Sequence, residues 1–256
     1  MLRPRAIPVL LLKGGGLYKT LRFNQPAYVG DPLNTMRIFN EKEVDEICVL
    51  DIGERFGQKG PQFDLIREIA SEAFMPLSYG GGIRSLEEAQ AILKSGVEKV
   101  VVNSLAIFDR HEVARIVAYA GSSSVVVSID VKRNWLNRYQ VLTQSGTKKT
   151  GLSVVEAARA AEEMGAGEIL LNSIDRDGTM QGYDIELINN VVNAVSIPVV
   201  ACGGAGNLQH MREALAAGAS GASAGSMFVY QGRHRAVLIS YPSSAEIESL
   251  QVSVVT

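Results

Sequence analysis

An internal repeat narrows the possible folds of this chain more than any other feature of its sequence. Residues 80–108 return 122 positions later as residues 202–230, without a gap. Each copy reads as an apolar strand, a glycine turn, an amphipathic helix and a second apolar strand, which is a βαβ unit. The matched pairs are Gly81 and Gly203, Gly82 and Gly204, Leu86 and Leu208, Leu93 and Leu215, Gly96 and Gly218, and Ser104 and Ser226. Such units repeated through about 250 residues predict an α/β protein, a (β/α)8 TIM barrel with a two-fold half-barrel repeat.

The expected strands are continuously apolar or small rather than alternating, as in parallel strands covered by helices. They span residues 7–12, 47–51, 77–79, 100–102, 125–129, 169–171, 198–201 and 221–224. Helical patterns lie between most of them, and capping boxes are expected at Ser85 with Glu88 and at Ser153 with Glu156. Residues 134–149 predict a small hairpin after the fifth strand. Without a linker or low-complexity tract, we expect one domain over residues 1–256.

Composition narrows the class of partner. The chain is 46% hydrophobic and 20% charged, with a net charge of -2 and a pI near 6.0, which argues against nucleic acid or an acidic membrane surface. The opening residues 1–13 read better as a first strand than as a signal peptide, and no apolar segment is long enough to span a bilayer. Cys48 and Cys202 are too few for a disulfide framework or a zinc site. We therefore expect a cytoplasmic protein with a small-molecule or protein partner and no metal or cofactor.

Two glycine turns are the strongest candidates for binding a substrate. One follows the third expected strand at residues 80–82, and the other follows the seventh at residues 203–206. Glycine lets backbone amides approach an anion, and the helix that follows adds favourable partial charge. Ser104 and Ser226 end the fourth and eighth strands and could donate hydroxyls to the same anions. Two opposed cradles predict a long substrate with a phosphate at each end, unless the glycines serve turn geometry alone.

Asp130 follows the fifth apolar strand, where a partly desolvated carboxyl with a raised pKa can act as a general acid or base. The alternative is an aspartate that caps a loop or pairs with Lys132. Asp177 and Gly178 form a tight turn after the sixth strand that either offers an amide to a phosphate or is purely structural.

The long first loop, glycine-rich at its start, carries Lys19 and could close over a substrate, with Lys19 contacting an anion. A solvated lysine is the alternative.

Four charged residues stand just before apolar strands at the opposite end of the expected barrel, namely Arg5, Glu46, Lys99 and Glu168. They could pair as a ring that closes the barrel floor. The ring is either a plug or a gate.

At these strand ends the chain resembles the cyclase subunit of imidazole glycerol phosphate synthase, the HisF type. The segments that carry the resemblance are "SYGGGI", "VVVNS", "SIDVK", "GAGEILLNSIDRDGT" and "ACGGAG", within residues 4–230. In that family a HisH-type glutaminase docks at the barrel floor and sends ammonia through the barrel to a bisphosphate ribonucleotide at the other face. The products are imidazole glycerol phosphate and an aminoimidazole carboxamide nucleotide.

The resemblance also implies residue roles. One phosphate would be held by Gly82, Asn103 and Ser104, and the other by Asp177, Gly178, Gly204, Gly225 and Ser226. Lys19 would belong to the lid and Asp130 would be the acid or base, while Arg5, Glu46, Lys99 and Glu168 would form the ammonia gate.

The chain departs from that family at the end of the first strand. The family has a second catalytic aspartate there, followed by a lysine and another aspartate, and these positions are Leu11, Lys13 and Gly14 in this sequence. A lost acid or base typically costs about 10²- to 10⁴-fold in rate. The opening strand and residues 232–242 resemble a paralogous group from surface-polysaccharide loci, whose members work with a glutaminase and a separate sugar amidotransferase.

Three functions therefore stay open. The first is an ammonia-receiving barrel subunit that supports amidation of a phosphorylated or sugar substrate. The second is imidazole glycerol phosphate synthesis in histidine biosynthesis with a rearranged acid/base pair. The third is a non-catalytic conduit that activates a glutaminase and carries its ammonia.

Overall fold

The fold was obtained as a computed structural model that describes residues 4–57 and 59–250. Within that part of the chain, eight parallel strands close into a ring. Their order is β1 (Ala6–Lys13), β4 (Ile47–Asp51), β5 (Leu77–Gly80), β6 (Lys99–Val102), β7 (Val125–Arg133), β10 (Glu168–Ser173), β11 (Val199–Cys202) and β12 (Gly221–Ala224), with β12 paired to β1. This is the (β/α)8 barrel that the repeat predicts.

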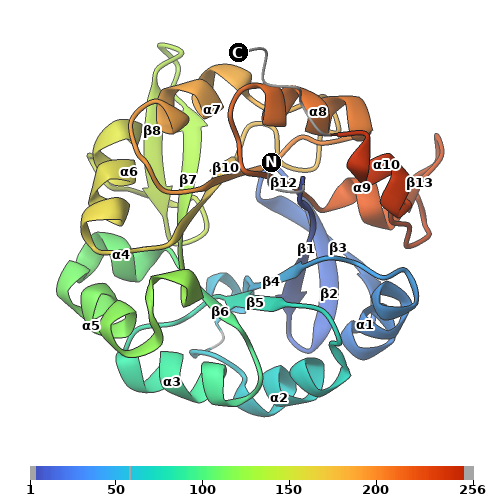
Figure 1. Ribbon diagram of the computed structural model, residues 1–256, viewed down its shortest axis with the longest axis horizontal. Coiled ribbons are helices and arrows are strands. Elements are labelled where there is room, and N and C mark those ends of the chain that lie inside the picture. Colours follow the sequence, from blue (N-terminus) through green and yellow to red (C-terminus); the bar gives the residue numbers. More distant parts are fainter. Residues whose placement is uncertain (1–3, 58, 251–256) are drawn as a thin grey trace.

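Helices surround the ring of strands on the outside, as Figure 1 shows. The long ones are α1 (Pro32–Glu41), α2 (Phe63–Glu72), α3 (Leu86–Lys94), α5 (Arg110–Ala120), α6 (Val154–Glu163), α7 (Ile185–Val192) and α8 (Leu208–Ala216). Shorter helical turns are η1 (Gly53–Phe56), α4 (Ser104–Phe108), η2 (Ser122–Ser124), α9 (Ser226–Val229) and α10 (Ser244–Glu248). Among the described residues, none of the helices is long and apolar enough to cross a membrane.

The two expected capping boxes turn out differently. Ser153 and Glu156 each satisfy the other's backbone N–H, so the box at the start of α6 is complete. At the start of α3, Ser85 accepts from the Glu88 N–H, but the Glu88 carboxylate accepts from the Arg84 N–H instead. That second box is therefore only half formed.

Apolar side chains pack in two separate clusters. The larger cluster lies between the sheet and the helices, and its fully buried members include Leu10, Leu12, Ile47 and Phe39. The smaller one fills the barrel axis with Ile7, Val9, Cys48, Val101, Val126, Leu170, Val200 and Cys202. Alternate residues of each strand thus face the helices or the axis, which is why the strands have no polar side.

Three antiparallel extensions depart from the simple barrel. The expected first loop is instead a ribbon in which β1 pairs with β2 (Gly16–Leu21) and β2 with β3 (Asn24–Gly30). β7 runs four residues beyond its predicted end and pairs with β8 (Tyr139–Thr143), which pairs with β9 (Lys148–Lys149). A third hairpin joins β13 (Tyr230–Gln231) to β14 (Ala236–Val237).

Candidate active site

The carboxyl ends of the barrel strands surround a cavity of about 410 Å³, which we call the mouth. Its wall includes Leu11 from β1, Asn103 after β6, Asp130 from β7 and Asn172 from β10. Loops from both halves of the repeat complete it, with Gly82 and Gly204 among them. The structure therefore brings the strand-end residues singled out in the sequence into one cavity, where barrel enzymes place their chemistry.

Both glycine turns need glycine for backbone reasons. Gly81 has φ +120° and Gly204 has φ +115°, and a Cβ on either would overlap a backbone oxygen, of Asp51 and Gly182 respectively. Gly82 differs, because an added Cβ would approach Gly60 at 3.2 Å and only its φ of +69° favours glycine. Turn geometry thus accounts for Gly81 and Gly204 by itself, although it leaves their amides at the mouth.

The two short helices α4 and α9 begin at equivalent places in the repeat. Asn103 precedes α4 and Gly225 precedes α9, and neither supplies a side-chain cap. The longer helices α3 and α8 are capped by Ser85 and Asn207. Within the part of the chain that the structure describes, α4 and α9 thus both start at the mouth without a side-chain cap.

The serines that begin these short helices differ in their surroundings. The Ser104 hydroxyl lies 2.7 Å from the Thr143 hydroxyl, and the Gln144 N–H donates to it at 3.4 Å. Ser226 is buried and lines the cavity. Thr143, which is fully buried at the end of β8, was missed by the sequence reasoning because only the hairpin's return path brings it beneath Ser104.

Asp130 is buried inside β7 rather than at its end, because β7 continues into the hairpin. Its carboxyl oxygens lie 3.5 Å from the Ser128 hydroxyl and 3.4 Å from the Asn103 amide nitrogen. Burial raises the pKa of Asp130 to about 7, and these long contacts do not offset the desolvation. Lys132, the alternative partner, is exposed. The side chain can therefore both give and take a proton near neutral pH.

Lys19 lies in β2 and is buried, so the solvated lysine considered from the sequence is excluded. Its ammonium donates to the carbonyl of Val9, and a Cβ on Gly225 would overlap it. Burial lowers the pKa of Lys19 to about 8, while Asp177 opposes that change. The expected lid residue thus belongs to the ribbon, and its buried ammonium lies next to the start of α9.

Asp177 fastens the β2–β3 ribbon to the mouth. Its carboxylate accepts from the Thr20 hydroxyl at 2.7 Å and from the Phe23 N–H at 3.1 Å, and its carbonyl accepts from the Arg22 N–H at 3.0 Å. A Cβ on Gly178 would overlap the Thr20 carbonyl oxygen. Desolvation raises the pKa of Asp177. The structural role of this turn is therefore plain, and the carboxylate faces N–H and O–H donors of the ribbon.

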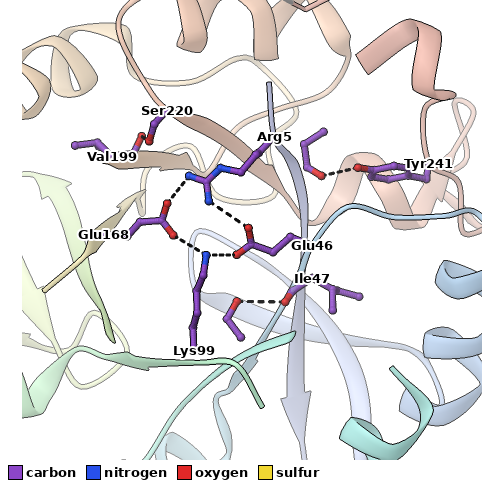
Figure 2. A network of polar contacts seen from close by, with 10 residues as sticks. Arg5, Glu46, Ile47, Lys99, Glu168, Val199, Ser220 and Tyr241 are labelled. Atoms are coloured by element: carbon purple, nitrogen blue, oxygen red, sulfur yellow. Dashed lines mark hydrogen bonds and ion pairs between the residues drawn. The ribbon is translucent and has the colours of Figure 1, made fainter. Parts of the chain in front are cut away.

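The amino ends of the strands, the floor, carry the four charged residues as an alternating ring (Figure 2). Lys99 Nζ lies 2.9 Å from Glu46 and 3.3 Å from Glu168, and Arg5 pairs with the same two carboxylates, at 3.2 Å in the case of Glu46. The pairing expected from the sequence is present. The pKa of Lys99 is raised, because the two glutamates outweigh the lowering effect of burial.

A small cavity of about 20 Å³ lies between the charged ring and the apolar side chains of the barrel interior. Glu46 and Glu168 bound it below, and Cys48 and Val101 line it above. Val101 also lines the mouth cavity. A space of this size holds one water-sized molecule. The barrel axis is therefore narrowed around Val101, with space on both sides.

Comparison with known proteins gives the family. Residues 5–235 match the family described as histidine biosynthesis protein. The chain is 51% identical over 252 residues to a protein of Leptospira interrogans that is provisionally named imidazole glycerol phosphate synthase subunit HisF, covering 98% of this chain and 99% of that protein. A Pseudomonas aeruginosa protein provisionally named subunit hisF2 is 48% identical over 249 residues, 97% and 99% of the two chains.

A protein named subunit HisF without that qualification is also similar. The one from Thermococcus gammatolerans is 43% identical over 231 residues, covering 90% of this chain and 91% of its own. The barrel, its charged floor and its mouth agree with this result, and the chain belongs to the histidine biosynthesis protein family as a member similar to the HisF subunit of imidazole glycerol phosphate synthase.

Proposed function

We propose that this protein is a barrel subunit that receives ammonia from a HisH-type glutaminase at the floor and delivers it to a phosphorylated or sugar substrate at the mouth. The proposal rests on what lies along the barrel axis. A closed ring of Arg5, Glu46, Lys99 and Glu168 stands at one end, and a cavity that contains Asp130 lies at the other. Space for one small molecule follows directly above the ring.

The ring would act as the gate. An uncharged ammonia molecule passes apolar side chains such as Val101 and Val126 more easily than an ion does, whereas the floor is blocked while four charges pair across it. Opening would require one charged side chain to leave the ring, which breaks two ion pairs. Docking of a glutaminase that competes for Lys99 or Arg5 would supply the free energy for that step.

The mouth supports a substrate with an anion at each end. Gly82, Asn103 and Ser104 would hold one phosphate, and Gly178, Gly204, Gly225 and Ser226 the other. The amides at the starts of α4 and α9 are the donors best placed for this purpose. Asp177 would contribute by fastening the ribbon above the second cradle, since its carboxylate would repel a phosphate.

Leu11 favours a substrate other than that of histidine synthesis. Its side chain lines the mouth, where the resemblance places a second aspartate. Asp130 would work with the buried amine of Lys19 in place of a carboxylate pair. The relatives provisionally named as HisF copies, including one numbered as a second copy, fit a paralogous role in sugar amidation with a separate amidotransferase.

The segment of residues 232–242 contacts both ends of the barrel. Arg235, between β13 and β14, donates to the Gly178 carbonyl at 2.6 Å. Further on, the Tyr241 hydroxyl donates to the Ala6 carbonyl at 2.8 Å, next to Arg5 (Figure 2). One segment thus contacts the mouth rim and the floor, the two places where a substrate and a glutaminase would bind.

The test is ammonium-driven turnover of the histidine-pathway bisphosphate substrate by the purified protein and by Leu11→Asp, with Leu11→Asn as an uncharged control of similar size. We expect no turnover by the wild-type protein. Partial activity in Leu11→Asp alone would show that one missing carboxylate separates the two chemistries. Robust wild-type turnover would instead establish imidazole glycerol phosphate synthesis, the second candidate, which the pKa of Asp130 near 7 favours.

A conduit without chemistry is the third candidate, and Leu11 favours it. In that case Asp130→Asn would leave glutaminase activation unchanged, and ammonia would leave the mouth unused. All three candidates require binding of a HisH-type glutaminase. If no HisH-type glutaminase of the same organism copurified with this protein, and Glu46→Lys, which reverses one charge of the ring, behaved like the wild type, the common premise would fail.

A further inference from the structure

Asn172 is a buried mouth residue that neither the sequence nor the comparisons assign to a role. It lies in β10 beside Asp130 of β7, its direct partner in the strand register. Hydrogen bonding from the Asn172 amide lowers the pKa of Asp130, although the desolvation that raises this pKa is the larger effect. Its amide oxygen is buried and, among the described residues, has no hydrogen-bond partner. A buried acceptor without a partner loses its hydration and gains no hydrogen bond in return, so it calls for an explanation.

Asn103 provides a contrast on the other side of Asp130. Its amide nitrogen donates to the Ser128 carbonyl at 2.9 Å, and its oxygen accepts from the Thr143 hydroxyl at 2.8 Å. Both ends of that amide are held, so rotation by half a turn would break two hydrogen bonds. Nothing in the described structure holds the oxygen of Asn172. Of the two amides beside Asp130, only that of Asn172 is free to turn over.

A carboxyl that transfers protons needs different partners in its two states. The carboxylate accepts hydrogen bonds, whereas the protonated acid must also donate one. We propose that Asn172 is a positioning residue for Asp130, whose amide donates to the carboxylate and turns over to accept from the protonated acid. The unpaired oxygen is then the acceptor for the second state, and each state costs the site only one unpaired atom. This inference deepens the proposed function, because it concerns the proton-transfer group of the same mouth.

The other groups around Asp130 differ from Asn172 in charge and in hydrogen bonding. The ionisable groups that face Asp130 are Asp177, after β10, and Cys202 in β11, with Lys19 next to Asp177. Burial raises the pKa of the Cys202 thiol to about 12, so it stays protonated. Asp177 is occupied by Thr20 and Phe23 of the ribbon. The Ser128 hydroxyl, 3.5 Å from an Asp130 carboxyl oxygen, also lowers the pKa of Asp130, and by more than the Asn172 amide does.

Turning over the Asn172 amide brings its N–H groups close to Gly203. A Cβ added to Gly203 would lie 3.0 Å from the Asn172 oxygen, so one Hα of Gly203 points at that oxygen. In the turned state the amide nitrogen takes this place. Nuclear Overhauser effects from the Asn172 side-chain amide to Gly203 Hα therefore report the orientation directly.

The experiment is NMR of the wild-type protein at pH 5.5 and pH 8.5, with labelled asparagine side chains. We expect a stronger nuclear Overhauser effect between the Asn172 amide protons and Gly203 Hα at pH 5.5 than at pH 8.5, with a midpoint equal to that of the Asp130 carboxyl 13C signal. Asn103 is the internal control and keeps one orientation throughout. In Asp130→Asn, the pH dependence of the Asn172 signals disappears.

One orientation of Asn172 at both pH values would overturn the inference, as would a reorientation that persists in Asp130→Asn. The wild-type spectra decide the first point without any variant having to fold. No substrate or glutaminase is present, so a fixed amide would leave the proposed function untouched, and a failed turnover assay would leave the inference untouched.

Discussion

The mouth and the floor of this barrel accommodate buried charge in opposite ways. At the floor, Arg5 and Lys99 alternate with Glu46 and Glu168, and each group has an opposite charge on both sides. At the mouth, Asp130 and Lys19 hydrogen-bond to uncharged groups, and their pKa values move toward neutrality, to about 7 and about 8. Pairing preserves charge at the floor, whereas desolvation makes the mouth ready to exchange protons at neutral pH.

The two ends of the barrel therefore contribute differently to stability and to chemistry. Charges that stay ionised and paired hold a shape, and they open only when a partner replaces one of them. Groups titrating near pH 7 reduce the stability of the fold but suit acid/base chemistry. Four experiments, ordered from the largest expected effect to the smallest, test this contrast.

Asp130→Asn removes the carboxyl whose pKa burial raises to about 7. In the unfolded chain the group ionises near pH 4, so the folded protein holds an extra proton between about pH 4 and pH 7, and its stability falls as pH rises through that window. The variant should be more stable than the wild type by about 3 kcal/mol at pH 8 and should lose this gain below pH 4. Urea unfolding at several pH values measures it. Exposed Asp64→Asn is the control, and a pH-independent difference would contradict the prediction.

Lys99→Ala breaks the ring at the floor and leaves Glu46 and Glu168 facing Arg5 alone. Removing one partner of a partly buried ion network should cost about 2–3 kcal/mol in the free energy of unfolding. In the complex, the variant should also uncouple glutamine hydrolysis from ammonia use at the mouth. Exposed Lys94→Ala should change neither quantity. Unchanged coupling in Lys99→Ala would reduce the ring to a plug.

Gly81→Ala and Gly121→Ala compare a glycine at the mouth with one at the floor. Both have positive φ, +120° and +82°, so both variants bear backbone strain of about 1–3 kcal/mol. At position 81 the added Cβ would also overlap the Asp51 carbonyl oxygen, whereas at position 121 it would meet no atom within 4 Å. Gly81→Ala should therefore lose about 2 kcal/mol more in thermal or urea unfolding. Equal losses would mean that the turn at the mouth relaxes freely.

Thr20→Val removes the hydroxyl that donates to Asp177 while keeping the shape of the side chain. Loss of this hydrogen bond should cost about 1 kcal/mol and loosen the ribbon. The amides of Arg22 and Phe23, which donate to Asp177, should exchange with deuterium faster. Thr147→Val, which loses an exposed bond to Gln144, serves as the control. Unchanged exchange would show that Asp177 does not hold the ribbon closed.

Most of the barrel could be predicted because its strands are continuous apolar segments in the sequence. The ranges 47–51 and 221–224 match β4 and β12 at both ends, and the other six differ by a few residues. The largest difference, four residues at the end of β7, has a structural cause. β7 and β1 each continue into an antiparallel extension, and a strand that leaves the barrel keeps its backbone pairing while its side chains become exposed. Polar residues there look like a loop in the sequence.

The sequence by itself determined which residues could act. Asp130 stood out as a carboxyl in an apolar run, the glycine turns stood out by their repeat, and the floor charges stood out by their positions before strands. These signals are local, since each needs only the neighbours of one residue along the chain.

Only the tertiary structure decided what those residues contact. It placed Thr143 under Ser104, committed Asp177 to the ribbon, buried Lys19 against Val9 and left the oxygen of Asn172 unpaired. Each of these facts depends on segments that are distant in sequence meeting at the mouth. A pKa or a hydrogen bond is set by the atoms within a few ångströms in space, and the sequence does not specify those atoms until the barrel closes.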